Sequence, residues 1–195
     1  SNKIIVNYDN KPLYNIVLTD DFLDLSQLLV QLGMDKRRFM IISDQNVSKL
    51  YLESMIEVIK PIANSMETFI FSPGEESKNL DTVNRCYEQL IENSFDRNDV
   101  LIALGGGVVG DLTGFIAATY LRGIRFIQVP TSLLAMVDSS IGGKTGVDYK
   151  SYKNMIGAFH QPSLVYMNLS TLNSLPDREY YSGMAEIIKH GLIRD

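Results

Sequence analysis

Residues 99–121 read DVLIALGGGVVGDLTGFIAATYL, and this stretch decides the fold because it joins a buried strand, a glycine turn and a helix. Residues 100–104 form a nearly continuous apolar run, which is typical of a parallel strand covered on both faces. Gly105, Gly107 and Gly110 then follow the spacing G-x-G-x-x-G, in which absent side chains let backbone amides and a helix N-terminus approach a pyrophosphate. A tight turn without any ligand would use the same glycines. The order of strand, turn and helix favours a dinucleotide-binding loop.

The chain up to residue 168 alternates between strand and helix patterns. We expect further strands at residues 3–8, 14–18, 38–43, 68–71, 125–129 and 164–168, with helices of about a dozen residues between several of them. The first two strands flank a turn composition and are expected to pair as a hairpin, after which Asp20 or Asp21 caps the first helix. This alternation predicts an α/β fold with a mainly parallel sheet flanked by helices.

Composition and charge narrow the classes of partner. The 195 residues are 45% hydrophobic and 21% charged, which is ordinary for a soluble globular protein. A formal net charge of −5 argues against a nucleic-acid surface, and no apolar run approaches the roughly 20 residues of a membrane span. The N-terminus lacks a signal-peptide pattern, so we expect a cytoplasmic protein without nucleic-acid or membrane partners. Cys86, the single cysteine, excludes an intrachain disulfide and is expected to be a buried small residue.

A composition shift near residues 175–177 predicts a domain boundary. Strand signals cease there, and residues 179–193 have a helical pattern throughout. We therefore expect an α/β domain at residues 1–174 and the start of an all-helical second domain at residues 175–195. The helical pattern reaches Asp195 without a stop signal, which predicts a truncated chain whose second domain is largely missing.

The acidic residue that would bind the ribose of a cofactor does not lie at the position it has in a standard Rossmann fold. That fold places an acid about 20 residues after the glycines, at the end of the next strand. Here the next strand ends in Gln128, Val129 and Pro130. Asp44, which ends an earlier strand, is the better candidate for the ribose or adenosine hydroxyls. The sequence therefore predicts a Rossmann-like fold with a non-standard strand order.

Residues 131–162 are dense in polar groups suited to an anionic, hydroxylated ligand. They include Thr131, Ser132, Asp138, Ser139, Lys144, Thr145, Lys153 and Asn154. Gly143, Lys144 and Thr145 would fit the end of a phosphate-binding P-loop, but the first glycine of that motif would fall on Asp138. A carboxylate there would repel phosphates, and no strand is expected immediately before it. We therefore reject a P-loop.

Two other sets of polar residues could each have either a structural or a ligand-binding role. Glu186 and His190 are four residues apart, so on a helix both could reach a metal ion, or with Lys189 they could form a solvated surface cluster. The polar turn at residues 73–78 could cap the following helix or bind a ligand. His160 is expected to be a packed loop histidine.

Four segments resemble one enzyme family. LGGGVVGDLTGF (residues 104–115), YLRGIRFIQVPTSLLAMVDSSIGGKTGV (120–147), KNMIGAFHQP (153–162) and SGMAEIIKHGLI (182–193) are closely similar to 3-dehydroquinate synthase, the second enzyme of the shikimate pathway. The similarity runs from residue 43 or so to the end of the chain. It covers the family's N-terminal NAD-binding domain and the first helices of its C-terminal domain.

The resemblance implies an NAD site and one metal ligand. Asp44, Asn46, Glu75 and Lys78 would contact the adenosine side of NAD. The pyrophosphate would be held by Gly106, Gly107, Val108, Val109, Gly110 and Asp111, and the pocket would be completed by Thr131, Ser132, Lys144, Lys153, Thr171, Leu172, Asn173 and Ser174. Glu186 would bind zinc or cobalt, and the family's two histidine ligands lie further along than Asp195. His190 matches a position that is not a ligand in the family.

The resemblance also implies the substrate 3-deoxy-D-arabino-heptulosonate 7-phosphate and its conversion to 3-dehydroquinate and phosphate. NAD would accept and return a hydride, and the metal would act as a Lewis acid on the substrate hydroxyl. Substrate contacts would come from Asp138, Lys144, Lys153, Asn154 and Lys189. Arg122 would reach the substrate of a neighbouring subunit, which implies a homodimer of the full-length protein.

For the 195-residue chain the expectation is narrower. Without the two downstream histidines the metal site is incomplete, so we expect weak NAD binding and no turnover. The alternatives are another sugar-phosphate cyclase such as 2-deoxy-scyllo-inosose synthase, the more distant iron-type alcohol dehydrogenases, and a non-catalytic NAD-binding module. Product analysis would separate the enzymes, and calorimetry with NAD⁺ would separate a binding module from an inert fragment.

Overall fold

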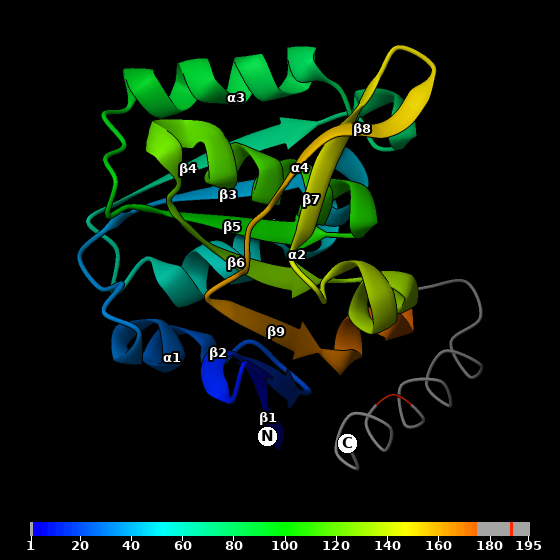
Figure 1. Ribbon diagram of the computed structural model, residues 1–195. Coiled ribbons are helices and arrows are strands. Elements are labelled where there is room, and N and C mark those ends of the chain that lie inside the picture. The colour runs from blue at the N-terminus through cyan, green and yellow to red at the C-terminus, as the bar shows by residue number, and fades with distance from the viewer. Residues whose placement is uncertain (1, 175–187, 189–195) are drawn as a thin grey trace.

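Seven strands form one sheet in the computed structural model, which describes residues 2–174 and residue 188 (Figure 1). The order across the sheet is β1-β2-β9-β6-β5-β3-β4. The bounds are β1 Asn2–Tyr8, β2 Lys11–Thr19, β3 Arg38–Asp44, β4 Ser65–Phe71, β5 Val100–Gly105, β6 Arg125–Pro130 and β9 Leu164–Asn168. β1 pairs with β2 in the antiparallel sense, and the other neighbouring pairs are parallel. The predicted N-terminal hairpin and mainly parallel sheet are confirmed.

Helices cover both faces of this sheet. Figure 1 shows helices α3 (Leu80–Glu92) and α4 (Gly107–Thr119) on one face, with α1 (Leu25–Gln31) and α2 (Gln45–Ile59) on the other. Successive residues of a strand point to opposite faces, so Ile42 packs in the α3–α4 core and Ile41 in the α1–α2 core. The apolar runs in the sequence are continuous because these strands are buried from both sides.

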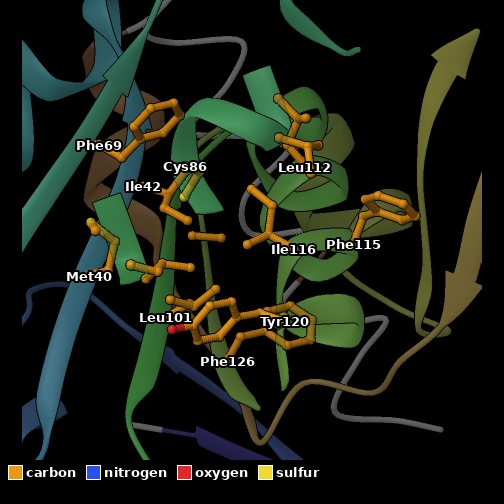
Figure 2. Close-up of a cluster of buried hydrophobic side chains, with 14 of the residues drawn as sticks. Met40, Ile42, Phe69, Cys86, Leu101, Leu112, Phe115, Ile116, Tyr120 and Phe126 are labelled. Atoms are coloured by element: carbon orange, nitrogen blue, oxygen red, sulfur yellow. The ribbon is translucent and has the colours of Figure 1, made fainter. Parts of the chain in front are cut away.

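The core beneath α3 and α4 is apolar and closely packed. Figure 2 shows Met40, Ile42, Leu101 and Phe126 of the sheet facing side chains of α4. Cys86 of α3 lies in the same cluster with its thiol fully buried, and burial raises the pKa of this thiol to about 12. The expectation that Cys86 is a buried small residue is confirmed.

The strand order creates a switch point between β3 and β5. From β3 the chain passes through α2 to β4 on one side, and from β5 it passes through α4 to β6 on the other side. The run β4-β3-β5-β6-β9 is the doubly wound order 2-1-3-4-5 rather than the 3-2-1-4-5-6 of the standard Rossmann fold. The predicted non-standard order is therefore confirmed. Ligands of such sheets bind outside the carboxyl ends of the strands that flank the switch point.

A second, two-stranded sheet lies against α4 and was not predicted from the sequence. It consists of β7 (Lys144–Tyr149) and β8 (Tyr152–Phe159), which pair in the antiparallel sense (Figure 1). Gly146 is paired with Gly157, and a Cβ on Gly146 would lie 2.9 Å from the Ile156 carbonyl oxygen. Gly114 of α4 faces the Thr145 side chain, so the absence of a Cβ lets this hairpin pack directly onto the helix. The glycines that suggest a loop in the sequence are the ones that permit this close packing.

The predicted start of the first helix is wrong. Helix α1 begins at Leu25 rather than after Asp20 or Asp21. The Asp21 carboxylate accepts a hydrogen bond from the backbone amide of Leu23 at 2.9 Å. This bond forms a local turn, and the turn ends before the helix begins. The expectation for His160 is confirmed. This histidine is packed, with Nε2 2.8 Å from the Ile124 carbonyl oxygen.

Within the part of the chain that the structure describes, no helix is long and apolar enough to cross a membrane. The 3-10 turn η4 (Leu169–Ser174) follows β9, and the domain boundary expected after residue 174 stays a prediction. The second domain predicted for residues 175–195 lies outside the described residues.

Candidate functional site

The glycine turn places the open N-terminus of α4 at the switch point. Gly106 is the N-cap of this thirteen-residue helix and, being glycine, brings no side chain to its first amides. The neighbouring strand end is fixed to the turn, because the Thr131 amide donates to the Gly105 carbonyl at 3.0 Å. A helix N-terminus with accessible amides and a positive dipole is suited to an anion such as a pyrophosphate.

Two serine hydroxyls lie beside this turn. A Cβ on Gly107 would lie 3.1 Å from Ser139 Oγ, and a Cβ on Gly106 would lie 3.5 Å from Ser132 Oγ. Among the described residues, Ser139 Oγ is buried without a hydrogen-bond partner. Side chains at the two glycines would therefore occupy the space between the turn and these hydroxyls. The donors present fit the pyrophosphate of a dinucleotide.

Asp44 lies at the end of the adjacent strand. Ser43 pairs with Leu104 in the sheet, and its hydroxyl donates to the Leu104 carbonyl at 2.6 Å, so the ends of β3 and β5 are tied together. The Asp44 carboxylate caps α2, with Oδ1 accepting the amides of Asn46 and Val47 at 2.8 Å each. Both bonds use Oδ1, and Oδ2 takes no part in the cap. The structure thus places Asp44 beside the glycine turn, as the sequence predicts.

The ends of β6 and β9 carry further residues predicted for the cofactor. Thr131 and Ser132 directly follow β6. The turn η4 follows β9 and is held by the Tyr51 hydroxyl, which donates to the Thr171 carbonyl at 3.2 Å. The side chains of Thr171 and Leu172 are fully buried, so this turn offers a ligand its backbone rather than these two side chains.

A cavity of about 660 Å³ opens between α4, the β7–β8 hairpin and the segment before the hairpin, which consists of the π-helix η3 (Ala135–Ser139) and a short loop. Four of the residues that the family resemblance assigns to the site line it, namely Asp111, Asp138, Lys144 and Asn154. The other lining residues are Ser139, Ile141, Gly142, Thr145, Gly146, Gly157, Ala158 and Phe159. Its size suits a small ligand, and its wall carries groups of both charges.

Lys78 lies behind this wall. Its side chain is only 4% exposed, and Nζ donates to Asp111 Oδ2 at 2.7 Å and to Asn154 Oδ1 at 2.6 Å. The cap of α3 is made by Asn79, whose Oδ1 accepts the Thr82 amide at 3.0 Å. The polar turn before α3 therefore does not use its lysine as a helix cap. Its 3-10 segment η1 (Glu75–Ser77) brings Lys78 to the hairpin instead.

The charges around Lys78 shift one another's pKa. Burial raises the pKa of Asp111, and the Lys78 ammonium opposes this rise. A hydrogen bond with Asp148 raises the pKa of Glu75, and burial adds to that effect. Burial also acts to raise the pKa of Asp148, but the Asn154 amide, the Glu75 carboxyl and the lysines 78 and 153 together hold it below its ordinary value.

Some predicted site residues lie elsewhere or cannot be placed. Arg122 is exposed in the turn η2 (Tyr120–Arg122) at the C-terminal end of α4, where β6 begins, so it lies at the opposite edge of the sheet from the glycine turn. Glu186, Lys189 and His190 lie outside the described residues. No three histidine, cysteine, aspartate or glutamate side chains gather into a metal site among residues 2–174 and 188.

The structure gives a place at the site to two residues to which the sequence reasoning assigned no role, namely Ser139, which it named only among the polar groups of residues 131–162, and Asp148. Ser139 belongs to a polar stretch in which no motif distinguishes it from its neighbours. Asp148 is the penultimate residue of the hairpin strand β7 and accepts the Asn154 backbone amide at 2.7 Å. Only a prediction of the β7–β8 pairing would have brought Asp148 next to Asn154, and the glycine-rich sequence does not favour that pairing.

A doubly wound sheet with a glycine turn and an open helix N-terminus at its switch point defines a dinucleotide-binding type of α/β domain. The comparison with known proteins is more specific. The family model described as 3-dehydroquinate synthase N-terminal matches residues 68–182, and the chain belongs to this family. The fold and family expected from the sequence are both confirmed.

Curated relatives carry the same family name. A 3-dehydroquinate synthase from Prochlorococcus marinus is 47% identical over 99% of this chain and 53% of its own length. One from Nitrosospira multiformis is 53% identical over 83% of this chain and 44% of its own length. The chain thus spans about half the length of the curated relatives it matches.

Solved structures of related cyclases have the same fold. A 2-deoxy-scyllo-inosose synthase complexed with carbaglucose-6-phosphate, NAD⁺ and Co²⁺ superposes with a TM-score of 0.83 at 28% identity, over 96% of this chain and 50% of that one. The 2-epi-5-epi-valiolone synthase ValA from Streptomyces hygroscopicus, with NAD⁺ and Zn²⁺ bound, gives 0.76 at 28% identity, over 93% of this chain and 50% of that one.

Proposed function

We propose that this chain forms the NAD-binding part of a 3-dehydroquinate synthase. The observation that carries the proposal is the glycine turn at the β3–β5 switch point with Asp44 at the adjacent strand end. Membership of the family and the NAD⁺ in the solved structures of related cyclases support it. The two curated relatives described above, at 47% and 53% identity, are 3-dehydroquinate synthases, which favours this function over the alternative of an alcohol dehydrogenase.

Residues at the ends of different strands would bind different parts of the cofactor. The first amides of α4 and the hydroxyls of Ser132 and Ser139 would hold the pyrophosphate, and Asp44 Oδ2 would accept hydrogen bonds from ribose hydroxyls. Bound NAD supplies a hydride acceptor for a transient oxidation. The chain's own contribution is to fix the cofactor's orientation beside the cavity.

The cavity would hold the sugar-acid phosphate substrate, 3-deoxy-D-arabino-heptulosonate 7-phosphate. Lys144 in the cavity wall and Lys153, which precedes Asn154 on β8, would neutralise its carboxylate and phosphate, and Asp138 and Asn154 would bind its hydroxyls. These groups act by positioning and by preorganised charge, because each is held on the hairpin or on the segment that leads into it. The reaction would release phosphate and yield 3-dehydroquinate.

We further propose that the 195-residue chain alone does not catalyse this reaction. The predicted metal ligand Glu186 would need partners from additional chain, and Arg122 would serve the cavity of a second subunit in a cytoplasmic homodimer. Incubation of the chain with NAD⁺, Co²⁺ and the heptulosonate phosphate should release no inorganic phosphate. Sustained phosphate release by the chain alone would contradict this part of the proposal.

Replacing Asp44 with asparagine tests the cofactor site. Asparagine is as good an N-cap as aspartate, so α2 should keep its cap and the thermal midpoint should hardly change. Loss of the charged acceptor should weaken NAD⁺ binding by about 1.5–3 kcal/mol, which is roughly 10- to 150-fold, as measured by titration calorimetry. Asp21→Asn is the matched control, because Asp21 also accepts a backbone amide but lies in the turn before α1. Equal NAD⁺ affinity of Asp44→Asn and wild type would exclude Asp44 from the site.

A further inference from the structure

His160 connects the wall of the cavity to the turn that carries Arg122. Its backbone amide donates to the Gly143 carbonyl at 2.8 Å, directly before Lys144 at the start of β7. Its ring nitrogen Nε2 lies 2.8 Å from the carbonyl oxygen of Ile124, two residues after Arg122. Because a carbonyl oxygen can only accept a hydrogen bond, Nε2 is the donor. The main chain and the side chain of one residue therefore bind two segments that are distant in the sequence.

The turn that carries Arg122 has a backbone conformation that is unfavourable for its residues. Leu121 and Arg122 have φ values of +51° and +67°, and Gly123 follows with +122°. Non-glycine residues adopt left-handed backbone at a cost, and it persists where the surroundings hold it in place. The side chains of Leu121 and Arg122 are exposed, so their own packing contributes little to holding the turn. The conformation of the turn therefore depends on contacts made by its backbone.

Hydrogen bonds hold the backbone at the end of this turn from two sides. Toward α4, the Ile124 amide donates to the Ala117 carbonyl at 2.8 Å. On the other side, His160 binds the Ile124 carbonyl, which lies just before the pairing of β6 with β5 begins at Arg125. The histidine ring is itself fixed, because it stacks on the buried ring of Phe126 with the centroids 5.5 Å apart. The bond from His160 thus comes from a rigid donor.

We propose that His160 is a positioning residue, which holds the turn of residues 121–123 in the conformation that presents Arg122 and ties this turn to the end of β8 beside Lys144. The inference rests on the proposed function, because that function gives Arg122 its ligand in a second subunit and Lys144 its ligand in the chain's own cavity. One histidine then fixes a group for each of the two cavities of the homodimer. A histidine that is only packed would need its shape, whereas this role needs its hydrogen-bond donor.

Amide hydrogen exchange of the 195-residue chain tests the inference without any ligand. The exchange rate at Ile124 is divided by the rate at Ile102, a fully buried residue of the central strand β5, to separate local opening from a change in global stability. His160→Phe keeps a ring against Phe126 but removes the donor, and this ratio should rise at least about tenfold. His160→Gln removes the ring but keeps an amide donor near the position of Nε2, and the ratio should rise no more than about threefold above wild type.

Gln161→Met is the matched control, because Gln161 is the next residue and its side chain donates to the Gly142 carbonyl instead of the turn. Its ratio should stay within about twofold of wild type, since the bond to Ile124 is kept. If His160→Phe shows no cooperative thermal unfolding, His160→Met takes its place with the same expected ratio.

Two results would overturn the inference. A rise smaller than about tenfold in His160→Phe would show that the turn does not need the donor, and a larger rise than about threefold in His160→Gln would show that the histidine acts through its shape. The proposed function fails separately, if wild type does not bind NAD⁺ in titration calorimetry. The exchange ratios still decide in that case whether His160 holds the turn.

Discussion

Replacing Gly106 with aspartate should weaken NAD⁺ binding by roughly 100-fold or more while leaving the fold as stable as wild type or slightly more stable. Gly106 is the N-cap of α4 with φ −82° and ψ −160°, a conformation open to any residue, and aspartate is a preferred N-cap. The contact nearest to a Cβ there is Ser132 Oγ at 3.5 Å, so the substitution meets no steric barrier. The new carboxylate would accept the amides that the pyrophosphate needs and would repel the phosphates. Juxtaposed like charges cost several kcal/mol, which corresponds to roughly 100-fold or more in affinity.

Gly106→Asn separates charge from size in this experiment. Asparagine has nearly the same shape as aspartate and is also a good N-cap, but it carries no charge. We expect Gly106→Asp to bind NAD⁺ at least about tenfold more weakly than Gly106→Asn in titration calorimetry, with similar thermal midpoints for both. Wild-type affinity in Gly106→Asp would show that no phosphate lies at the N-terminus of α4.

Phe126→Ala should have the largest effect on stability. Phe126 is fully buried in the core between the sheet and α4 (Figure 2), and its ring stacks on His160 with centroids 5.5 Å apart. Truncation of such a phenylalanine leaves a cavity and typically costs about 3–5 kcal/mol of unfolding free energy. A domain of this kind has a total of about 5–15 kcal/mol, so urea unfolding should shift to a much lower midpoint.

Phe159→Ala is the control for this change. Phe159 lies on β8 with 81% of its surface exposed, so the same truncation there should alter the unfolding free energy by no more than about 0.5 kcal/mol. A cost below about 1 kcal/mol for Phe126→Ala would contradict the packing described for this core.

The sheet was predictable from the sequence because its signals are local and strong. A strand that is buried on both faces needs an unbroken apolar run, and Val100 to Leu104 provide one. The strand order came from a single chemical argument, namely that an acid is needed beside the glycine turn and that Asp44 is the acid at a strand end. The β3–β5 pairing agrees with that argument.

The hairpin could not be predicted because its stability depends on contacts distant in the sequence. Gly146 and Gly157 weaken any strand signal, yet they are needed where the two backbones and α4 approach closely. The prediction of the cap of the first helix failed for a local reason. Asp21 accepts a hydrogen bond from a backbone amide in a turn, and aspartate is favoured both in such turns and as a helix N-cap.

The sequence predicted which residues form the candidate site better than it predicted what each of them does there. Asp138, Lys144 and Asn154 do line one cavity. The burial of Lys78 was not foreseeable, because nothing in a polar turn indicates that its lysine faces inward against Asp111. Roles for Glu186 and Lys189 stay predictions, since both lie outside the described residues.

Hydrogen exchange of the wild-type chain with and without NAD⁺ tests the central claim that the cofactor binds at the β3–β5 switch point. We expect slower exchange at residues 44–47, 105–111 and 131–132 when NAD⁺ is present. Residues 33–38, at the opposite edge of the sheet, should exchange at unchanged rates. Unchanged exchange at residues 105–111 under saturating NAD⁺, or protection confined to other segments, would contradict the account.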